Sequence, residues 1–287
     1  IADMHSITED FNPKEKQKQI LELAADFWAS GINLQKSVLF LQSVIAAHSE
    51  LAWIFNTITS IGELRRMTQF KDKAEAQKQN VNAGLLTYPA LMAADVLLYD
   101  AKFVPVGEDQ LQHLELARTL ARKFNNRFGK TFNEPQPILT KTPRVMSLSD
   151  PRKKMSKSEP SGCLFIDDSP EEIKKKISRA TTDSGSEIKY DPEKKAGISN
   201  LLGIYSALSN KPIAKIEKEF RSKGYAEFKS GLANLVVNYF SNFRKSKKSL
   251  LAKPQTLLAV LKSGSVKANK IANKKISEVK KKIGIVI

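Results

Sequence analysis

The sequence predicts an α/β fold in which helices wrap a parallel sheet, followed by an all-helical C-terminal domain. Two observations carry this prediction. Through the first 130 residues, short apolar runs alternate with segments of helical periodicity, which is typical of parallel strands joined by helices. From Ile198 onward, helical patterns follow one another, separated by Gly, Ser, Asn and Pro. We therefore expect an α/β domain over 1–182 and a helical domain over 183–287.

The first elements are predicted by their end signals. Ile1–Ile7 is expected to be the end of a strand. Asn12-Pro13 combines an N-cap residue with proline at the first helical position, and Gly31 is a natural C-terminal stop, so a helix is expected between them. Ser37–Leu41 (SVLFL) is a short apolar run and is predicted to be a buried strand.

The later elements follow from hydrophobic periodicity. Helices are predicted over three ranges: His48 to about Met67, Leu85–Leu98 and Gln110–Phe124. Phe103–Val106 (FVPV) predicts a strand, and the capping box that begins at Ser169 opens a further helix. Trp28 and Trp53 lie within helical apolar patterns and are expected in the core.

Charge is distributed unevenly along the chain. Of a net charge of +17, the segment 211–287 holds +15, from 19 Lys and Arg against 4 Glu. A nearly neutral body joined to a basic tail indicates a phosphate-rich partner. Nucleic acid is the first candidate for this partner, and an anionic membrane is the second. A lysine-rich solvated surface is the equally weighted alternative.

The remaining composition excludes several classes of protein. Cys163 is the only cysteine, which excludes a disulfide framework and a cysteine-cluster zinc site. The three histidines lack the spacing of a metal motif, so no protein-bound metal is predicted. No apolar run approaches the roughly 20 residues that a membrane-spanning helix needs.

A cation-rich segment, Asp150–Gly162, is bracketed by prolines and a glycine and is therefore predicted to be a loop. Within seven residues it gathers four cations and two hydroxyls: Arg152, Lys153, Lys154, Lys157, Ser156 and Ser158. Such a loop can close over a triphosphate and stabilise the charge that develops on a departing pyrophosphate. An ordinary basic surface loop is the alternative, and for a generic sequence the more common one.

Asp95 is an acid within an otherwise apolar stretch. Tyr88, Met92 and Asp95 are spaced i, i+4, i+7 and share one face of the predicted helix. A buried carboxylate is costly unless it is hydrogen-bonded. Asp95 is therefore either a structural acid bound to a neighbouring element or an acceptor for a ligand N–H or O–H, and the pattern favours neither.

A turn, Gly107-Glu108-Asp109-Gln110, joins the predicted strand at Phe103–Val106 to the next helix. Ligands bind at the carboxyl ends of parallel strands, where glycine allows close backbone approach and an acid can take ribose hydroxyls. The alternative is that the two acids at the start of the helix only complement the helix dipole.

Several segments together resemble the tryptophanyl-tRNA synthetases, a class I family. Lys154-Met155-Ser156-Lys157-Ser158 is KMSKS, the signature loop of that class, and it stands between an α/β and a basic helical region as in the family. The other similar segments are HSIT (His5–Thr8), GELRRMTQFKDK (Gly62–Lys73), Gly84–Arg118, Arg144–Pro160 and Thr182–Ser209. The resemblance covers essentially the whole chain. It implies a Rossmann-like catalytic domain that includes the KMSKS loop, and a helical domain that binds the tRNA anticodon.

The resemblance implies a tryptophan site. Asp95 would accept the indole N–H. The other implied residues are Tyr88 and Met92 in the same pocket, His5 and Gln110 near the amino-acid head group, and Val104 and Val106 facing the indole.

The resemblance also implies an ATP site. Its residues would be Lys73, Gly107, Glu108, Asp109, Val145, Lys154, Met155, Ser156, Lys157 and Ser158. Lys154, Ser156 and Lys157 are the catalytic candidates, and the two lysines are placed to stabilise transition-state charge. No general base is required, because the attacking carboxylate is already ionised.

The implied activity is that of a tryptophan–tRNA ligase. Tryptophan and Mg-ATP would give tryptophanyl-adenylate, whose acyl group passes to tRNA(Trp). ATP with Mg²⁺ is a substrate complex here, and no resident cofactor or membrane partner is expected. The family also implies a homodimer and a cytoplasmic location, with the mitochondrial matrix as the alternative.

The chain departs from the family pattern at one motif. Class I synthetases also bind ATP through an HIGH-like motif, and this sequence has neither that motif nor a P-loop or GxGxxG to replace it. In the family the motif precedes the segment where this chain starts, so we expect a few tens of further residues before Ile1. Two other interpretations stay open: a tyrosyl-tRNA synthetase, which typically has Gln at the position of Met92, and a non-catalytic RNA-binding protein derived from a synthetase.

Overall fold

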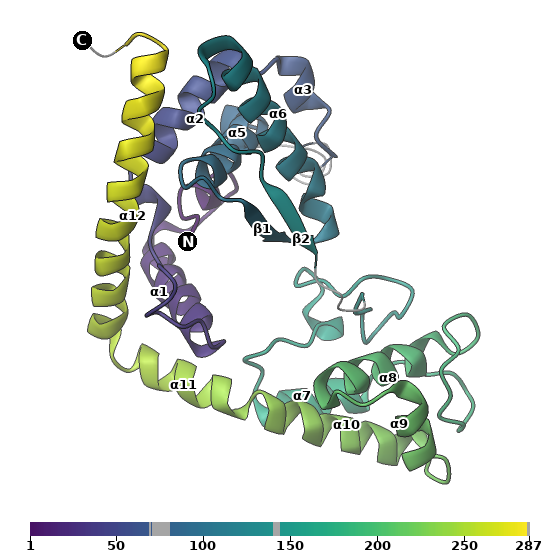
Figure 1. Cartoon of the computed structure of the whole chain (residues 1–287). Coiled ribbons are helices and arrows are strands. Elements are labelled where there is room, and N and C mark those ends of the chain that lie inside the picture. Colours follow the sequence, from purple (N-terminus) through teal and green to yellow (C-terminus); the bar gives the residue numbers. More distant parts are fainter. Residues whose placement is uncertain (69, 71–80, 140–143, 286–287) are drawn as a thin grey trace. The chain divides into compact units, whose positions relative to one another are not determined.

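A computed structural model of the chain describes residues 1–68, 70, 81–139 and 144–285 (Figure 1). The chain divides into two compact units. Unit 1 comprises Ile1–Thr140 and Leu250–Ile287, and unit 2 comprises Lys141–Ser249. This division differs from the boundary expected near residue 182, because the KMSKS loop groups with the helices after it and the last helix groups with unit 1.

The sheet of unit 1 is parallel, and the α/β fold class is confirmed. Strand β1 (Phe103–Val106) pairs with β2 (Gln136–Leu139) in register from Phe103 opposite Gln136 to Val106 opposite Leu139. Helix α6 (Leu111–Phe128) connects the two strands, as expected for a parallel crossover. Sequence reasoning did not predict β2.

The two N-terminal strand predictions are wrong for the described residues. His5–Ile7 forms a 3₁₀ helix (η1), and Ser37–Leu41 has no strand assignment. The backbone N of Ile1 donates to the Phe40 carbonyl at 2.8 Å, and the Gln42 N–H donates to the Ile1 carbonyl at 3.0 Å. This is the hydrogen-bond pattern of a single parallel bridge, and a second 3₁₀ helix (η2, Gln42–Val44) follows it directly.

The predicted helices of unit 1 are present, with one divided in two. Helix α1 (Pro13–Ala29) begins where Asn12 accepts a hydrogen bond from the Lys14 N–H. The helix predicted from His48 to Met67 is instead α2 (Ala47–Ile58) and α3 (Ile61–Arg65). A capping box between Ser60 and Glu63 starts the second helix and so separates it from the first.

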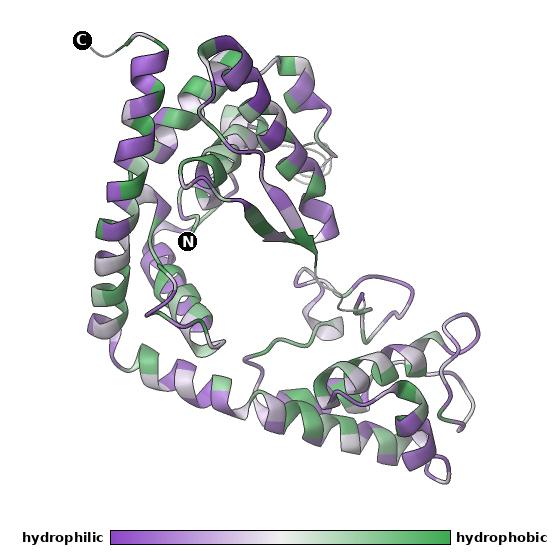
Figure 2. Ribbon diagram, viewed as in Figure 1, coloured by the Kyte–Doolittle hydropathy of each residue, from purple (hydrophilic) through white to green (hydrophobic). Residues whose placement is uncertain are grey.

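Helices α2, α5 (Ala83–Leu97), α6 and α12 (Pro254–Lys282) enclose the core of unit 1. Figure 2 shows hydrophobic and hydrophilic residues alternating along α12, as in an amphipathic helix. Its Ala268, Ala272, Ile276 and Val279 are buried in the same cluster as Phe55. Trp53 was expected there, but 72% of it is exposed.

Unit 2 is helical, as the sequence predicted for most of it. Its helices are α7 (Pro170–Ser178), α8 (Ala196–Ser209), α9 (Ile213–Glu219), α10 (Tyr225–Tyr239) and α11 (Ser241–Leu251), the last of which runs into the boundary with unit 1. Ser169 and Glu172 form the predicted capping box at the start of α7. The apolar faces of α7, α8 and α10 meet around Ile177, Leu202 and Phe228, which are fully buried.

The described residues contain neither a candidate membrane-spanning helix nor a candidate metal site. None of the helices formed by these residues has both the length and the apolarity needed to cross a bilayer. The described His, Cys, Asp and Glu side chains form no group of three that would suit a metal ion.

Candidate active site

Asp95 lies on α5 and is held by side chains from two other elements of unit 1. His48 Nδ1, on α2, lies 2.5 Å from Asp95 Oδ1. Gln42 Nε2, in η2, lies 2.8 Å from both carboxylate oxygens. His48 and Gln42 are almost fully buried, whereas 28% of the Asp95 side chain is exposed. Asp95 is therefore bound to neighbouring elements and still accessible, so both interpretations of its role remain compatible with its surroundings.

The hydrogen bonds continue on both sides of Asp95. His48 Nε2 lies 2.8 Å from the Tyr99 hydroxyl. Burial, and then the charge of Asp95, raise the pKa of Tyr99, so this hydroxyl stays protonated. Gln42 Oε1 accepts a hydrogen bond from the His5 backbone N–H at 3.1 Å. The amide of Gln42 is thereby oriented with its nitrogen toward Asp95.

Tyr88 and His5, two predicted tryptophan-site residues, lie together. Their ring centroids are 4.7 Å apart. The Tyr88 hydroxyl lies 2.9 Å from His113 Nε2 on α6, and the two rings stack. Burial, with the charge of Glu9, raises the pKa of Tyr88 to about 12. The structure therefore joins two residues that are far apart in the sequence and adds His113 to them.

The other predicted tryptophan-site residues also belong to unit 1 and are partly exposed. Met92 lies on α5, three residues before Asp95, while Val104 and Val106 alternate with exposed residues of β1. Gln110 closes the 3₁₀ helix η3 (Glu108–Gln110), and its amide donates to Asp109 Oδ2 at 2.9 Å. No distance joins these residues to Asp95, so their membership of one pocket stays a prediction.

The turn Gly107-Glu108-Asp109 directly follows β1, at the carboxyl end of that strand, and all three residues are exposed. A Cβ at Gly107 would lie only 2.7 Å from Asp109 Oδ1, so glycine is needed for the acid to take this position. Exposed acids at a strand's carboxyl end can accept hydrogen bonds from the hydroxyl groups of a ligand. Lys73, the remaining candidate before β1, lies outside the described residues.

The KMSKS loop is anchored at its base in unit 2. The Met155 N–H donates to the Val145 carbonyl at 3.1 Å, and the Ser147 N–H donates to the Lys153 carbonyl at 2.8 Å. Asn200 on α8 binds both backbone groups of Met146, accepting from its N–H at 2.9 Å and donating to its carbonyl at 2.8 Å. This anchor brings together Val145 and Met155, two of the predicted ATP residues.

Val145 and Met155 also line an apolar cavity of about 530 Å³ in unit 2. The remaining wall includes Asn200, Ile204 and Val236 from α8 and α10. A mostly apolar cavity with a few polar groups is the usual form of a small-molecule site.

The four cations of the loop divide into two pairs. Arg152 Nε lies 3.1 Å from Asp150 Oδ1, and Lys153 Nζ lies 3.7 Å from Asp150 Oδ2. The hydrogen bonds from Arg152, with both positive charges, hold the pKa of Asp150 below its usual range. Lys154 and Lys157 are exposed, and no carboxylate of the described residues lies within ion-pair distance of either. These two cations are therefore available to an anionic ligand, as are the exposed Ser156 and Ser158.

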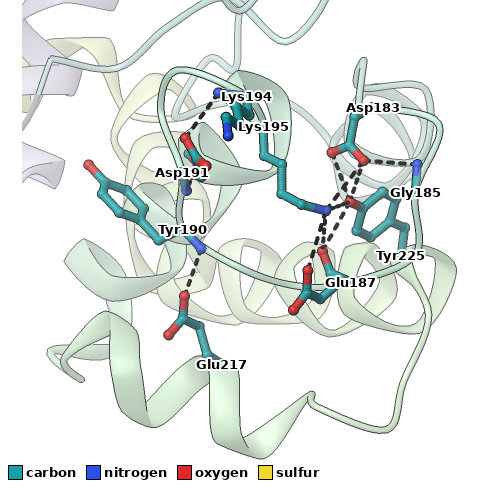
Figure 3. A network of polar contacts seen from close by, with 10 residues as sticks. Asp183, Gly185, Glu187, Tyr190, Asp191, Lys194, Lys195, Glu217 and Tyr225 are labelled. Atoms are coloured by element: carbon teal, nitrogen blue, oxygen red, sulfur yellow. Dashed lines mark hydrogen bonds and ion pairs between the residues drawn. The ribbon is translucent and has the colours of Figure 1, made fainter.

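A polar network fixes the start of α8, the helix that carries Asn200 (Figure 3). Asp183 accepts hydrogen bonds from the Tyr225 hydroxyl at 2.8 Å and from the Gly185 N–H at 2.9 Å, and Lys195 lies 3.6 Å from it. Burial opposes the ionisation of Asp183, but these hydrogen bonds and the Lys195 charge together lower its pKa. The network thus ties Lys195, the residue before α8, to Asp183 and to Tyr225 of α10.

Comparison with known proteins agrees with this geometry. The chain matches the family described as tRNA synthetases class I (W and Y) over residues 1–241. It is 46% identical to the tryptophan–tRNA ligase of Caldanaerobacter subterraneus, and the match covers 100% of this chain and 88% of that protein. This chain belongs to the tryptophanyl-tRNA synthetases. The expectation drawn from KMSKS and its companion segments is confirmed.

Two solved structures of tryptophanyl-tRNA synthetases are similar along the whole fold. The Mycoplasma pneumoniae enzyme has a TM-score of 0.89 at 36% identity, covering 100% of this chain and 87% of that one. The Campylobacter jejuni enzyme was solved in complex with ADP and tryptophan. It has a TM-score of 0.86 at 36% identity, and the match covers 99% of this chain and 88% of that one.

Sequence reasoning missed the residues that support the candidates. His48, Gln42 and Tyr99 surround Asp95 from positions 4 to 53 residues away, and Asn200 binds Met146 across 54 residues. Their only sequence signal was the presence of polar residues beside apolar runs. Such contacts are set by the tertiary fold, and local patterns do not encode them.

Proposed function

We propose that the chain carries out both half-reactions of a tryptophan–tRNA ligase. In the first, a carboxylate oxygen of tryptophan attacks the α-phosphorus of ATP, and the bond to the bridging oxygen breaks to release pyrophosphate. In the second, a hydroxyl of the terminal adenosine of tRNA(Trp) attacks the acyl carbon, and AMP leaves. The single observation that carries the proposal is 46% identity to a curated tryptophan–tRNA ligase over the whole chain.

The tryptophan site is proposed to centre on Asp95, whose carboxylate accepts the indole N–H. Tyr88 and Met92 share its helix, and the contact of Tyr88 with His5 supports a common site for these two residues. Val104 and Val106 are assigned to the indole face, and Gln110 to the amino-acid head group.

The residues proposed to contact ATP are those that the family resemblance implies. In unit 1 the assigned residues are Lys73, Gly107, Glu108 and Asp109, with the two acids accepting ribose hydroxyls. In unit 2, Val145 and Met155 offer apolar surface at the cavity, which suits a purine base. Lys154 and Lys157, which lack carboxylate partners among the described residues, would stabilise the charge on pyrophosphate, with Ser156 and Ser158 donating to phosphate oxygens. Mg²⁺ would arrive with ATP as part of the substrate.

The basic tail is proposed to bind tRNA. Its +15 is shared between the units: residues 211–249 hold ten Lys and Arg against three Glu, and residues 250–287 hold nine Lys against one Glu. Lysines that neutralise phosphates release counterions and so support binding. The helical part of unit 2 is assigned to the anticodon. We also propose a cytoplasmic location, since the relatives come from bacteria. The homodimer is proposed from the family resemblance alone.

The test is ATP–pyrophosphate exchange with each of the twenty amino acids, followed by charging of tRNA(Trp). Exchange that depends on tryptophan alone is the expected result. Exchange supported by tyrosine would overturn the substrate assignment. RNA binding without exchange for any amino acid would indicate the non-catalytic RNA-binding alternative.

A further inference from the structure

The hydrogen bonds around Asp95 leave a defined part of its carboxylate open. A carboxylate offers about four lone-pair sites, two on each oxygen. Oδ1 receives His48 Nδ1 and Gln42 Nε2, and Oδ2 receives Gln42 Nε2. Among the described residues, no other donor reaches Asp95. One acceptor site on Oδ2 therefore remains, on a side chain that keeps 28% of its surface exposed.

The donors that fill the other sites are themselves fixed. A carboxylate can only accept hydrogen bonds, so His48 Nδ1 donates to Asp95, while the Tyr99 hydroxyl at 2.8 Å holds His48 Nε2 on the other side of the ring. The His5 N–H occupies Gln42 Oε1, so the Gln42 amide cannot turn its oxygen toward the acid without losing a hydrogen bond. His48 and Gln42 are 1% and 2% exposed, which excludes replacement of these donors by bulk water.

We propose that His48 is a positioning residue for substrate specificity, which together with Gln42 orients Asp95 so that Oδ2 presents one acceptor to a ring N–H. This inference rests on the proposed role of Asp95 and deepens it. Without the His48 N–H, Oδ1 would regain a free lone pair and the carboxylate could rotate about its χ2 bond. The acceptor would then no longer be held in one direction, and preference for a ligand with a matching donor would fall.

The matched ligand pair is tryptophan and 3-(benzothiophen-3-yl)alanine, in which sulfur replaces the indole N–H at nearly constant shape. Dissociation constants for both, measured by calorimetry on the full chain, give a preference ratio. In His48→Leu we expect this ratio to fall by about tenfold, mainly through weaker tryptophan binding. In His48→Asn the amide nitrogen lies near the position of Nδ1, and we expect most of the preference to return.

Two controls separate the possible failures. If His48→Leu weakens both ligands equally, or if His48→Asn does not restore the ratio, then His48 acts on the fold alone and the positioning role is overturned. If Asp95→Asn leaves the ratio unchanged, the assignment of Asp95 itself is wrong and the positioning role falls with it. A thermal unfolding midpoint for each variant identifies any loss of folded protein, which would lower both affinities together.

Discussion

Asp95 and the lysines of the KMSKS loop differ in how many partners their charged groups have within the protein. Asp95 receives hydrogen bonds from His48 and Gln42 on three of its acceptor sites. Lys154 and Lys157 project from an anchored loop without a carboxylate partner among the described residues. A site that recognises a permanent N–H benefits from a fixed acceptor, whereas charge that develops during a reaction needs cations not already neutralised. The contrast supports the proposed roles, in which Asp95 recognises the ground state of the substrate and the two lysines stabilise the transition state.

The largest expected effect tests the free cations. Lys157→Ala should slow tryptophan-dependent pyrophosphate exchange by about 10²–10³-fold, because a preorganised charge at the departing pyrophosphate is lost. Tryptophan affinity should change by less than about twofold. Arg152→Ala is the matched control, since Asp150 already pairs with that cation, and it should cost only a few-fold. Equal losses in rate and tryptophan affinity for Lys157→Ala would make the loop a ground-state binding element.

The fixed acceptor is tested by Asp95→Asn. An amide places a donor where an acceptor faces the indole N–H, and losing a hydrogen bond to a charged group costs about 1.5–3 kcal/mol. Tryptophan affinity should therefore fall by about 10–100-fold. Calorimetric titration measures this, with ATP affinity as the internal control. Wild-type affinity and exchange in this variant would contradict the assignment of Asp95.

The anchor of the loop gives a smaller expected effect. Asn200→Ala removes both hydrogen bonds to Met146, at a cost of about 1–3 kcal/mol to the loop base. We expect the KM for ATP to rise about five- to tenfold while tryptophan affinity stays near wild type. Asn200→Asp is the informative companion, because it keeps the acceptor for the Met146 N–H and loses only the donor. An unchanged KM for ATP in Asn200→Ala would show that the loop is held by its other contacts.

The smallest effect concerns tRNA. Of the cluster at Arg244–Lys248, Lys247 already lies 2.7 Å from Asp167, and Arg244 donates to the Val237 carbonyl. Reversal is therefore limited to the exposed Lys245 and Lys248. The double change to Glu should lower tRNA charging a few-fold and reduce the log–log salt slope by about one to two units. Pyrophosphate exchange without tRNA is the control, and an unaltered salt slope would make this cluster a solvated surface.

Local signals predicted the helices well, and contacts between distant segments account for what was missed. The capping residues Asn12 and Ser169 start helices where expected, because a cap satisfies backbone groups within its own turn. Ser37–Leu41 has the composition of a strand, but a strand also needs a partner, and among the described residues the hydrogen bonds that join Phe40 and Gln42 to Ile1 do not extend along this segment. Trp53 is exposed because it lies on the side of α2 opposite the stripe that Leu51, Ile54 and Phe55 form, so the helical period itself turns it away from the core.

The candidate site was predicted to a different extent in its two regions. Asp95 and the KMSKS lysines are visible in the sequence, since an acid in an apolar run and a dense cation cluster are both unusual. The division of the four loop cations by Asp150 was not visible, because any of them could have paired with that acid. The partners of Asp95 lie on separate elements, so only the assembled fold identifies them.

The position of α12 has a consequence for synthesis of the protein on the ribosome. Unit 2 is complete once Ser249 has been made, whereas unit 1 still lacks its last 38 residues. Those residues include Ala268, Ala272, Ile276 and Val279, which pack beside Phe55, and Gly264, where any side chain would overlap the Leu39 carbonyl. Folding in the order of synthesis therefore cannot complete unit 1 before unit 2. The inserted unit can fold while the chain is still growing, and the nascent surface around Phe55 stays uncovered until α12 has been made.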